Sequence, residues 1–333
     1  MINSINLIIL PIISFILTFL LTPLIMKFMI KIGKTGIDIH KLNKPMIPDM
    51  GGLSIILGIL ISAIVMYMLN ELTAIVIASL LAALIAGIIG LLDDIFNLGG
   101  ILKPVLTIFA FLPIWLMGTY SPHPALPFIP GTRLFIVYSL LLPFSIAVTA
   151  NAVNMLDVIN GATPLTTIPV FIALAVSGVL LGGRGIEVIS MVAVASLIAF
   201  YYYNKYPART FMGNAGDFFI GGLIGALAVT GRLEIVGIVA LMPQIMNGFY
   251  ILSSMKRLFE HRSVKDKPVK LREDGLLEAS DNPKAPISLL RLLLMKSPEH
   301  EKDLATSFFI LSLVSCVLAI ITAYLTTIRL WGV

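Results

Sequence analysis

The chain has 333 residues, of which 58% are hydrophobic and only 12% charged, with a net charge of +5 and a mean hydropathy of +1.00. Soluble globular domains carry about 25% charged residues, so this composition excludes a soluble cytosolic enzyme, and its apolar content excludes a disordered chain. The single cysteine, Cys316, excludes a disulfide framework and a cysteine zinc site. The composition predicts an all-α fold, a polytopic membrane helix bundle.

Ten segments are apolar over about the 20 residues that a membrane-spanning helix needs. We expect the first to be an anchor rather than a signal peptide, because it is long and has no cleavage-site signature. All ten are assigned to one integral membrane domain, residues 1–333. The segments are roughly 5–26, 51–70, 73–92, 103–119, 133–150, 164–181, 187–203, 217–231, 234–253 and 304–326.

Lysine and arginine are distributed unevenly between the two sets of connections. All but four of the 23 lie in residues 27–50, 93–103, 151–163, 204–216 and a long loop, 254–303. The positive-inside rule makes this set cytoplasmic, with both termini outside. Most acidic residues lie there too, which predicts an active site on the cytoplasmic face. A transporter is disfavoured, because it needs polar groups near the membrane midplane.

The first polar motif closes the third apolar segment. Asp93 and Asp94 are adjacent, and Asn97 follows Asp93 by one helical turn on the same face. Adjacent carboxylates at a membrane boundary repel each other unless a cation or a basic group lies between them. The alternative is a solvated helix end that only stops the span.

The second motif repeats polar residues at every third position. Asn151, Asn154 and Asp157 share about a third of a helix circumference, and Asn160-Gly161 then predicts a turn. Amide and carboxylate oxygens suit Mg²⁺, and amides also suit hydrogen bonds to a nucleobase. The alternative is hydrogen bonding between helices, which explains four polar positions poorly.

The third motif precedes the eighth segment. Asn214 and Asp217 lie at i and i+3 beside Gly213 and Gly216, so both side chains can share a face at a helix start. The free N–H groups of a first turn favour an anion. The alternative is an ordinary N-cap, for which Asn and Asp are common residues.

Two connections carry the remaining candidates. The long loop 254–303 is rich in lysine and arginine and could bind a diphosphate, or act only as a topology signal attracted to anionic lipid. Residues 40–52 hold many turn residues and are not expected to be helical throughout.

In their order along the chain, these motifs resemble the polyprenyl-phosphate N-acetylhexosamine-1-phosphate transferase family, of glycosyltransferase 4 type. The resemblance extends over nearly the whole chain. It is strongest toward the dolichyl-phosphate N-acetylglucosamine-phosphotransferase branch of eukaryotes and archaea. The residues that favour this branch are Asp93-Asp94 with Asn97-Leu98, Asn151, Asn154, Asn160-Gly161, and Pro243-Gln244 with Asn247 and Tyr250.

The resemblance implies roles for particular residues. Asp93 and Asp94 would face the reacting phosphates as catalytic residues, together with Lys103, which would hold phosphate. Asn154 would be a metal ligand. The implied substrate-binding residues are Asp49 at the nucleotide-sugar end, Asn97, Asn151 beside the metal ligand, Asn160 on the uracil, and Lys265 and Lys267 on phosphate.

Two departures from the family pattern affect the site. Asn214 stands where the family has the aspartate of a Gly-Asp pair, so one negative charge is lost from the metal site. Asp217, one turn on, could restore it, and both are candidate metal ligands. The basic-His-basic cluster of the family is replaced by Lys265-Asp266-Lys267, or is shifted to His261-Arg262.

The implied reaction transfers N-acetylglucosamine 1-phosphate from a UDP-N-acetylhexosamine to polyprenyl (dolichyl) phosphate, releasing UMP. Mg²⁺ is the expected cofactor, with Mn²⁺ as a substitute. Membrane lipids and a second copy in a homodimer are the other expected partners, and no nucleic acid is expected. The membrane would be the cell membrane in a prokaryote or the endoplasmic reticulum in a eukaryote. The alternatives are an undecaprenyl-phosphate transferase with another UDP-sugar, a catalytically silent family member, and a transporter.

Overall fold

The computed structural model describes residues 6–129, 132–183, 185–255 and 266–328, and these are mainly helical. The longer helices are α1 (Asn6–Lys31), α2 (Leu53–Met68), α3 (Ala74–Phe96), α6 (Phe135–Leu156), α7 (Ala162–Leu181), α8 (Ile186–Asn204), α9 (Gly213–Thr230), α11 (Met242–Met255) and α13 (Glu301–Thr327). The shorter ones are α4 (Leu102–Ile108), the 3-10 turn η1 (Phe109–Phe111), α5 (Leu112–Leu116), α10 (Glu234–Ala240) and α12 (Leu289–Leu293).

Each of the ten predicted apolar segments is helical over most of its length. In the described residues, seven helices are long and apolar enough to cross a membrane: α1, α3, α6, α7, α8, α9 and α13. The pair α10 and α11 gives an eighth span if it is counted as one, although it is bent by 69°. The segments at α2 and at α4–α5 are shorter, so the figure of ten spans stays a prediction.

The bend between α10 and α11 has a local cause in the sequence. Pro243 lies in the first turn of α11 and has no N–H to donate to the preceding turn, so a continuous helix would lose a hydrogen bond there. A proline is tolerated in a first helical turn, which explains why a new helix begins here in a new direction.

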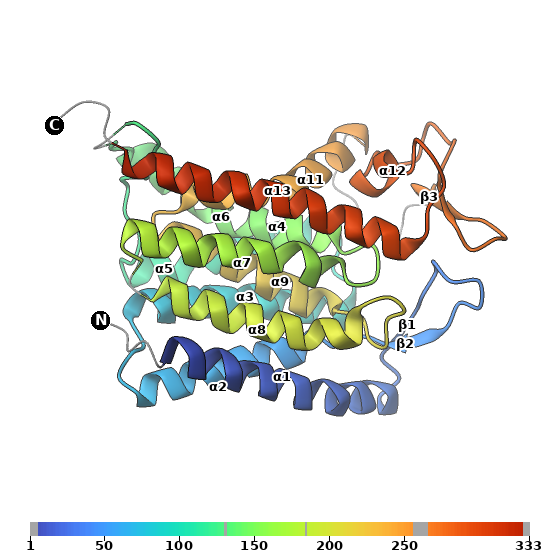
Figure 1. The fold of residues 1–333 in the computed structure, drawn as a ribbon, viewed down its shortest axis with the longest axis horizontal. Coiled ribbons are helices and arrows are strands. Elements are labelled where there is room, and N and C mark those ends of the chain that lie inside the picture. Colours follow the sequence, from blue (N-terminus) through green and yellow to red (C-terminus); the bar gives the residue numbers. More distant parts are fainter. Residues whose placement is uncertain (1–5, 130–131, 184, 256–265, 329–333) are drawn as a thin grey trace.

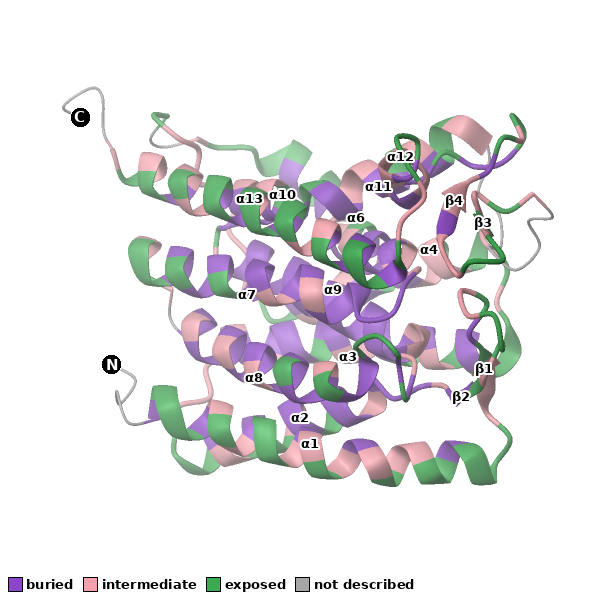
Figure 2. Ribbon diagram, turned by 45° about the vertical axis from the view of Figure 1, so that its right-hand side comes forward, coloured by how far each residue is buried: buried purple, intermediate pink, exposed green. Residues whose placement is uncertain are grey.

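The helices form a layered bundle with α9 at its centre. Helices α13, α7, α8 and α1 lie side by side in one layer, and α9 lies behind them against α3 and α6 (Figure 1). Every residue of α9 from Ala215 to Thr230 is buried, and the buried colour is concentrated in α9 and its neighbours (Figure 2). A Cβ on Gly221 would lie 2.6 Å from the Thr149 carbonyl oxygen of α6, so glycine permits this close packing.

Two small β-hairpins correct the all-α prediction. Strand β1 (Thr35–Ile37) pairs with β2 (Met46–Pro48), and β3 (Val269–Leu271) pairs with β4 (Leu277–Ala279), both antiparallel. The strands have three residues each, which is too short for an alternating pattern to be recognised in the sequence. Both hairpins lie at one end of the bundle, opposite the end where α1 begins and α13 finishes (Figure 1).

The described part of the long loop, residues 266–300, folds into a cap over that end. Its residues Leu277, Leu290 and Leu294 are buried in one cluster with Leu156 of α6 and Phe308 of α13. Asn247 of α11 joins the cap to the bundle, because it accepts from the Leu289 backbone and donates to the Met155 carbonyl. The segment is therefore a packed structure and not only a topology signal.

Candidate functional site

Asp93 and Asp94 lie in the last turn of α3, which packs against the start of α9. Asp94 Oδ1 accepts a hydrogen bond from the Asn214 backbone at 3.1 Å, and Oδ2 accepts one from the Ala215 backbone at 3.0 Å. The carboxylate therefore occupies the anion-binding position at the N-terminus of α9. Gly90 permits this approach, because a Cβ there would collide with the Asn214 backbone.

Asp93 is the most buried charge at this end of α3, at 1% exposure. Its Oδ2 lies 2.6 Å from the Lys103 ammonium of α4 and also 2.6 Å from the Asn214 side-chain nitrogen. Its Oδ1 is buried and has no hydrogen-bond partner among the described residues. A buried carboxylate oxygen without a partner is costly, so this atom is available to bind a ligand.

The amide and carboxylate residues predicted as metal ligands come together beside Asp93. Asn154 of α6 donates to Asn214 Oδ1 at 2.6 Å and to Asp217 Oδ2 at 3.3 Å. Asp217 is 2% exposed and accepts a 2.6 Å hydrogen bond from the Thr163 hydroxyl. The alternative of a simple N-cap fails, since the cap residue of α9 is Met212 and no side chain of its own caps it.

Asp157 extends the acidic cluster from the end of α6. It accepts a 3.3 Å hydrogen bond from the Thr163 backbone. Burial raises the pKa of the Asp157 carboxyl to about 6, against the hydrogen bonds from Thr163, which lower it. The negative charge of Asp49 raises this pKa further, so Asp49 also lies within electrostatic range of the cluster.

Two other predicted residues, Asn151 and Asn97, lie at the edge of this cluster. Asn151 donates to the Thr107 hydroxyl of α4 at 3.1 Å and to its own helix, which fixes α4 against α6. Asn97 is the exposed left-handed cap of α3, with φ of 53°, and no side-chain contact joins it to the described residues of the cluster. Lys34, which we did not predict, donates to the Asp94 carbonyl at 3.1 Å.

A second polar cluster surrounds Asn160, under the β1–β2 hairpin. The side chain of Asn160 donates to Asp38 at 3.0 Å, and its backbone donates to Glu301 of α13 at 2.7 Å. Lys41 pairs with both Asp38 and Glu301. Burial lowers the pKa of His40 below 6.5, although the charges of Glu301 and Asp38 raise it.

Sequence reasoning missed Asp38, Lys41 and Glu301 as parts of a site. Lys41 and Glu301 are 260 residues apart, and neither stands in a polar repeat. Lys41 lies in the turn-rich residues 40–52, which indicate an irregular loop without indicating its partner.

Of the two basic residues predicted to bind phosphate, only Lys267 lies in the described part of the cap. Lys265 lies outside the described residues, and Lys267 is exposed. In the described part of the cap, Lys270 pairs with Asp281 and Arg272 with Asp274. The role proposed for Lys265 and Lys267 stays a prediction.

The carboxylate and amide oxygens of the cluster are of the chemical type that binds a hard divalent cation, but the carboxylates alone do not form a metal site. No group of three or more His, Cys, Asp or Glu side chains with metal-binding geometry occurs in the described ranges. The candidate donors are the free Asp93 Oδ1, Asp217, and the amide oxygens of Asn154 and Asn214. Mg²⁺ accepts such oxygen ligands and keeps several waters, so these residues fit Mg²⁺.

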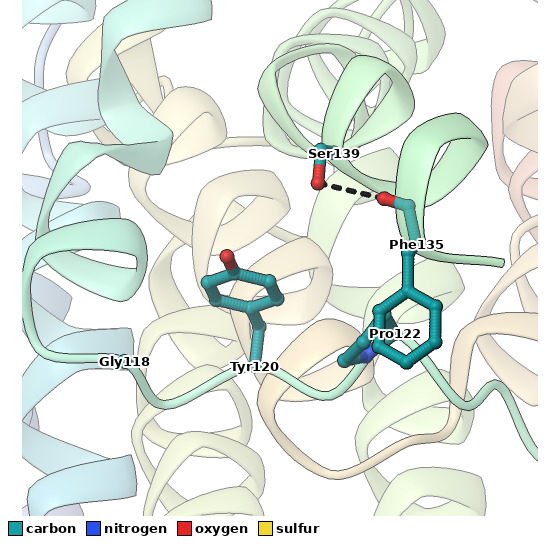
Figure 3. Close-up of a pocket in the computed structure, with 5 residues that line it drawn as sticks. All are labelled: Gly118, Tyr120, Pro122, Phe135 and Ser139. Carbon is teal, nitrogen blue, oxygen red and sulfur yellow. Dashed lines mark hydrogen bonds between the residues drawn. The ribbon is translucent and has the colours of Figure 1, made fainter. Parts of the chain in front are cut away.

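A cavity of about 320 Å³ lies at the opposite end of the bundle. Tyr120, Pro122, Phe135 and Ser139 line it, and the Ser139 hydroxyl donates to the Phe135 carbonyl at 2.8 Å (Figure 3). It contains none of the predicted site residues, so the candidate site is the acidic cluster where α3, α6 and α9 meet.

Comparison with known proteins gives concordant results. Residues 72–232 match the sequence model described as "Glycosyl transferase family 4". The chain is 32% identical over 254 residues to a putative UDP-N-acetylglucosamine–dolichyl-phosphate N-acetylglucosaminephosphotransferase of Sulfolobus acidocaldarius, covering 74% of this chain and 77% of the relative. A protein of the same description from Saccharolobus solfataricus is 34% identical over 244 residues, 72% of this chain and 76% of the relative.

The chain is also similar to a bacterial protein. A probable undecaprenyl-phosphate N-acetylglucosaminyl 1-phosphate transferase of Bacillus subtilis is 27% identical over 242 residues, which cover 71% of this chain and 66% of the relative. The matched region of the sequence model, 72–232, includes Asp93, Asp94, Asn154 and Asp217.

Proposed function

The chain belongs to glycosyl transferase family 4, and we propose that it transfers N-acetylglucosamine 1-phosphate from UDP-N-acetylglucosamine to a dolichyl-type polyprenyl phosphate. At the level of the family, it is a multi-pass integral membrane protein and a polyprenyl-phosphate sugar-1-phosphate transferase. The sugar and the polyprenol are proposed from the two archaeal relatives at 32% and 34% identity.

One observation carries the proposal for the active centre. Asp93, Lys103 and Asn214 meet in 2.6 Å contacts where α3 ends and α4 and α9 begin, and one Asp93 oxygen has no partner in the part of the chain that the structure describes. A fixed cation, a fixed carboxylate and a free oxygen in a buried place are what phosphoryl transfer needs, because its catalysis is mainly positioning and charge neutralisation.

The proposed reaction is an attack by an oxygen of the lipid phosphate on the β-phosphorus of the UDP-sugar. The new P–O bond forms as the bond to the α-phosphate oxygen breaks, so UMP leaves and a lipid diphosphate sugar remains. The lipid phosphate has a second pKa near 6 and is largely ionised at pH 7. We therefore assign Asp93 to organising charge rather than to removing a proton.

Each residue of the cluster has a proposed task. Lys103, fixed by Asp93, would neutralise phosphate charge, and Asp94 would hold the start of α9 in register. Asn154, Asn214 and Asp217 would hold Mg²⁺, for which Mn²⁺ can substitute. When bound, Mg²⁺ would offset the repulsion between the phosphates. Asn160 and Asp49 would bind the nucleotide end.

The membrane location follows the same reasoning. We propose that the cluster faces the cytoplasm, because the lysines and arginines are concentrated at this end. The cell membrane is favoured, since two of the relatives are archaeal. A homodimer is a further proposal, which light scattering of the detergent-solubilised protein would test.

The experiment is an assay of UMP release by purified protein in phosphatidylcholine nanodiscs. We expect release with UDP-N-acetylglucosamine and dolichyl phosphate, loss of release with EDTA, and recovery with MgCl₂. Asp93→Asn should reduce turnover at least about a hundredfold, through loss of electrostatic organisation, whereas the same change at an exposed aspartate of the cap, Asp281→Asn, should not. No release from any UDP-N-acetylhexosamine by folded protein would overturn the proposal.

The bacterial relative supports a second candidate within the same chemistry. An undecaprenyl-phosphate acceptor would give UMP release with undecaprenyl phosphate and little with dolichyl phosphate. A parallel assay with UDP-N-acetylgalactosamine tests the sugar in the same way. Folded protein that binds UDP-sugar but releases no UMP with either lipid would identify a silent family member.

A further inference from the structure

A hollow opens at the polar end of the bundle, on the face opposite α9. Helix α7 lies between α13 and α8 (Figure 1), and it begins only at Ala162. The first turns of α13 and the last turn of α8 therefore flank a space above the start of α7, with a volume of about 260 Å³. Its lining includes Leu165, Tyr201, Lys205, Lys302, Thr306 and Phe309.

The lining of this hollow is positively charged. Lys205 at the end of α8 and Lys302 at the start of α13 stand on its two sides, and both are exposed. Neither ammonium forms an ion pair with a residue in the described ranges, and no carboxylate lines the space. Tyr201 adds a phenol group, and the Thr306 hydroxyl already donates to the Lys302 carbonyl at 3.1 Å, so it is chiefly the two lysines that make the lining complementary to a phosphate.

The floor of the hollow continues into an apolar stripe along α7. Leu165 lines the hollow, and Ile168, Ile172, Val176 and Val179 follow it at intervals of three or four residues, on one face of the helix. The last three are 40%, 38% and 68% exposed. At 1.5 Å per residue the stripe is about 21 Å long, which exceeds one leaflet of a hydrocarbon core about 30 Å thick.

We propose that this hollow binds the phosphate headgroup of an anionic glycerophospholipid, whose acyl chains lie along α7 between α8 and α13. Basic pockets between transmembrane helices are suited to such headgroups. A soluble phosphate would use the two lysines but not the apolar stripe, so the continuity of the two surfaces selects the lipid. The hollow, with its lining residues, is called the headgroup pocket below.

The headgroup pocket shares a wall with the cluster around Asn160. Asn160 itself lines the pocket and donates to both Asp38 and Glu301. Glu301 directly precedes Lys302 on α13 and pairs with Lys41. A headgroup held by Lys302 therefore restrains the turn of α13 on which the β1–β2 hairpin is fixed. If the proposed function holds, lipid occupancy should favour binding of the UDP-sugar.

Native mass spectrometry of the detergent-solubilised protein tests the binding directly. The protein is titrated with phosphatidylglycerol or with phosphatidylcholine, and the retained lipids are counted. We expect one tightly held phosphatidylglycerol, lost in Lys205→Gln/Lys302→Gln. The matched control is Lys27→Gln/Lys31→Gln, which removes two exposed lysines from the C-terminal end of α1, at the same end of the bundle. This control protein should retain the lipid. Equal loss in both pairs, or in neither, would overturn the proposal.

Competition experiments separate the lipid from a free phosphate. Glycerol 3-phosphate and inorganic phosphate are added in excess to the complex with phosphatidylglycerol. Retention of the lipid supports the proposal, because the apolar stripe contributes to its affinity. Displacement at concentrations similar to that of the lipid would assign the pocket to a soluble phosphate and overturn the lipid assignment.

Activity measurements then test the coupling to the site. In nanodiscs, replacement of one fifth of the phosphatidylcholine by phosphatidylglycerol should lower the KM for the UDP-sugar about fivefold, which is modest for coupling between two sites. The Lys205→Gln/Lys302→Gln protein should not respond, and the control pair should. Lipid binding without a change in KM would remove the coupling, and lipid binding without any transfer would overturn the proposed function but not the pocket.

Discussion

The substitution Asn214→Asp tests the geometry of the acidic cluster most directly. Its side-chain nitrogen lies 2.6 Å from Asp93 Oδ2, so the change puts a carboxylate oxygen against another carboxylate. A hydrogen bond to a charged group, worth about 1.5–3 kcal/mol, is lost. Two charges about 3 Å apart also repel by about 5 kcal/mol at an effective dielectric constant of about 20, which Lys103 offsets in part.

We therefore expect a loss of at least about 3 kcal/mol in the free energy of unfolding. For a chain of this size, each kcal/mol lowers the melting temperature by roughly 2 °C, so a fall of about 6 °C or more is expected. A divalent cation between the carboxylates would restore stability, by about 2.7 kcal/mol at a hundred times its dissociation constant.

Thermal unfolding of the detergent-solubilised protein, with and without MgCl₂, measures both effects. Asn97→Asp is the matched control, because it adds the same charge at an exposed residue of the same helix end. Asn214→Ala separates the lost hydrogen bond from the added charge. Equal melting of Asn214→Asp and Asn97→Asp in both buffers would refute the contact with Asp93 and the proposed metal site with it.

Three further changes test other parts of the structure. Lys103→Ala leaves its buried carboxylate partner without a counter-charge, which costs roughly 3 kcal/mol and should abolish transfer, whereas Lys103→Arg should keep the stability. Gly221→Ala forces a Cβ into α6 and should lower the melting temperature, whereas Gly99→Ala, which meets open space, should not. A cysteine at Thr119 should react with an impermeant reagent from outside the cell, and one at Asn97 should not; the reverse pattern would invert the proposed orientation.

The sequence was most informative where polar residues interrupt apolar ones. Asp93, Asp94, Asn154 and Asp217 stand out against helices that are otherwise apolar, so they could be predicted as one group. The structure brings all four to the junction of α3, α6 and α9. Which of these residues contact one another could not be predicted, because the contacts depend on how closely α3 approaches α9 at Gly90.

The parts that the sequence did not predict depend on contacts across long distances in the chain. Asn97 follows Asp93 by four residues but is the left-handed cap of α3 and is exposed, so helical spacing alone does not give its position, and its role stays a prediction. Thr163 supports Asp217 from the start of α7, and a single threonine at the edge of an apolar segment carries no recognisable signal. The three-residue strands and the five-residue helix α12 of the cap are similarly too short to be recognised by periodicity.

The pairing of Lys41 with Glu301 has a consequence for synthesis on the ribosome. The two residues are 260 positions apart, so at about 5–20 residues per second the hairpin waits on the order of tens of seconds for its partner. During that time the nascent chain already contains α3, α6 and α9, yet its polar end is not closed. Chains that terminate before α13 would therefore hold the acidic cluster, while Asn160 and Lys41 would lack their partner Glu301.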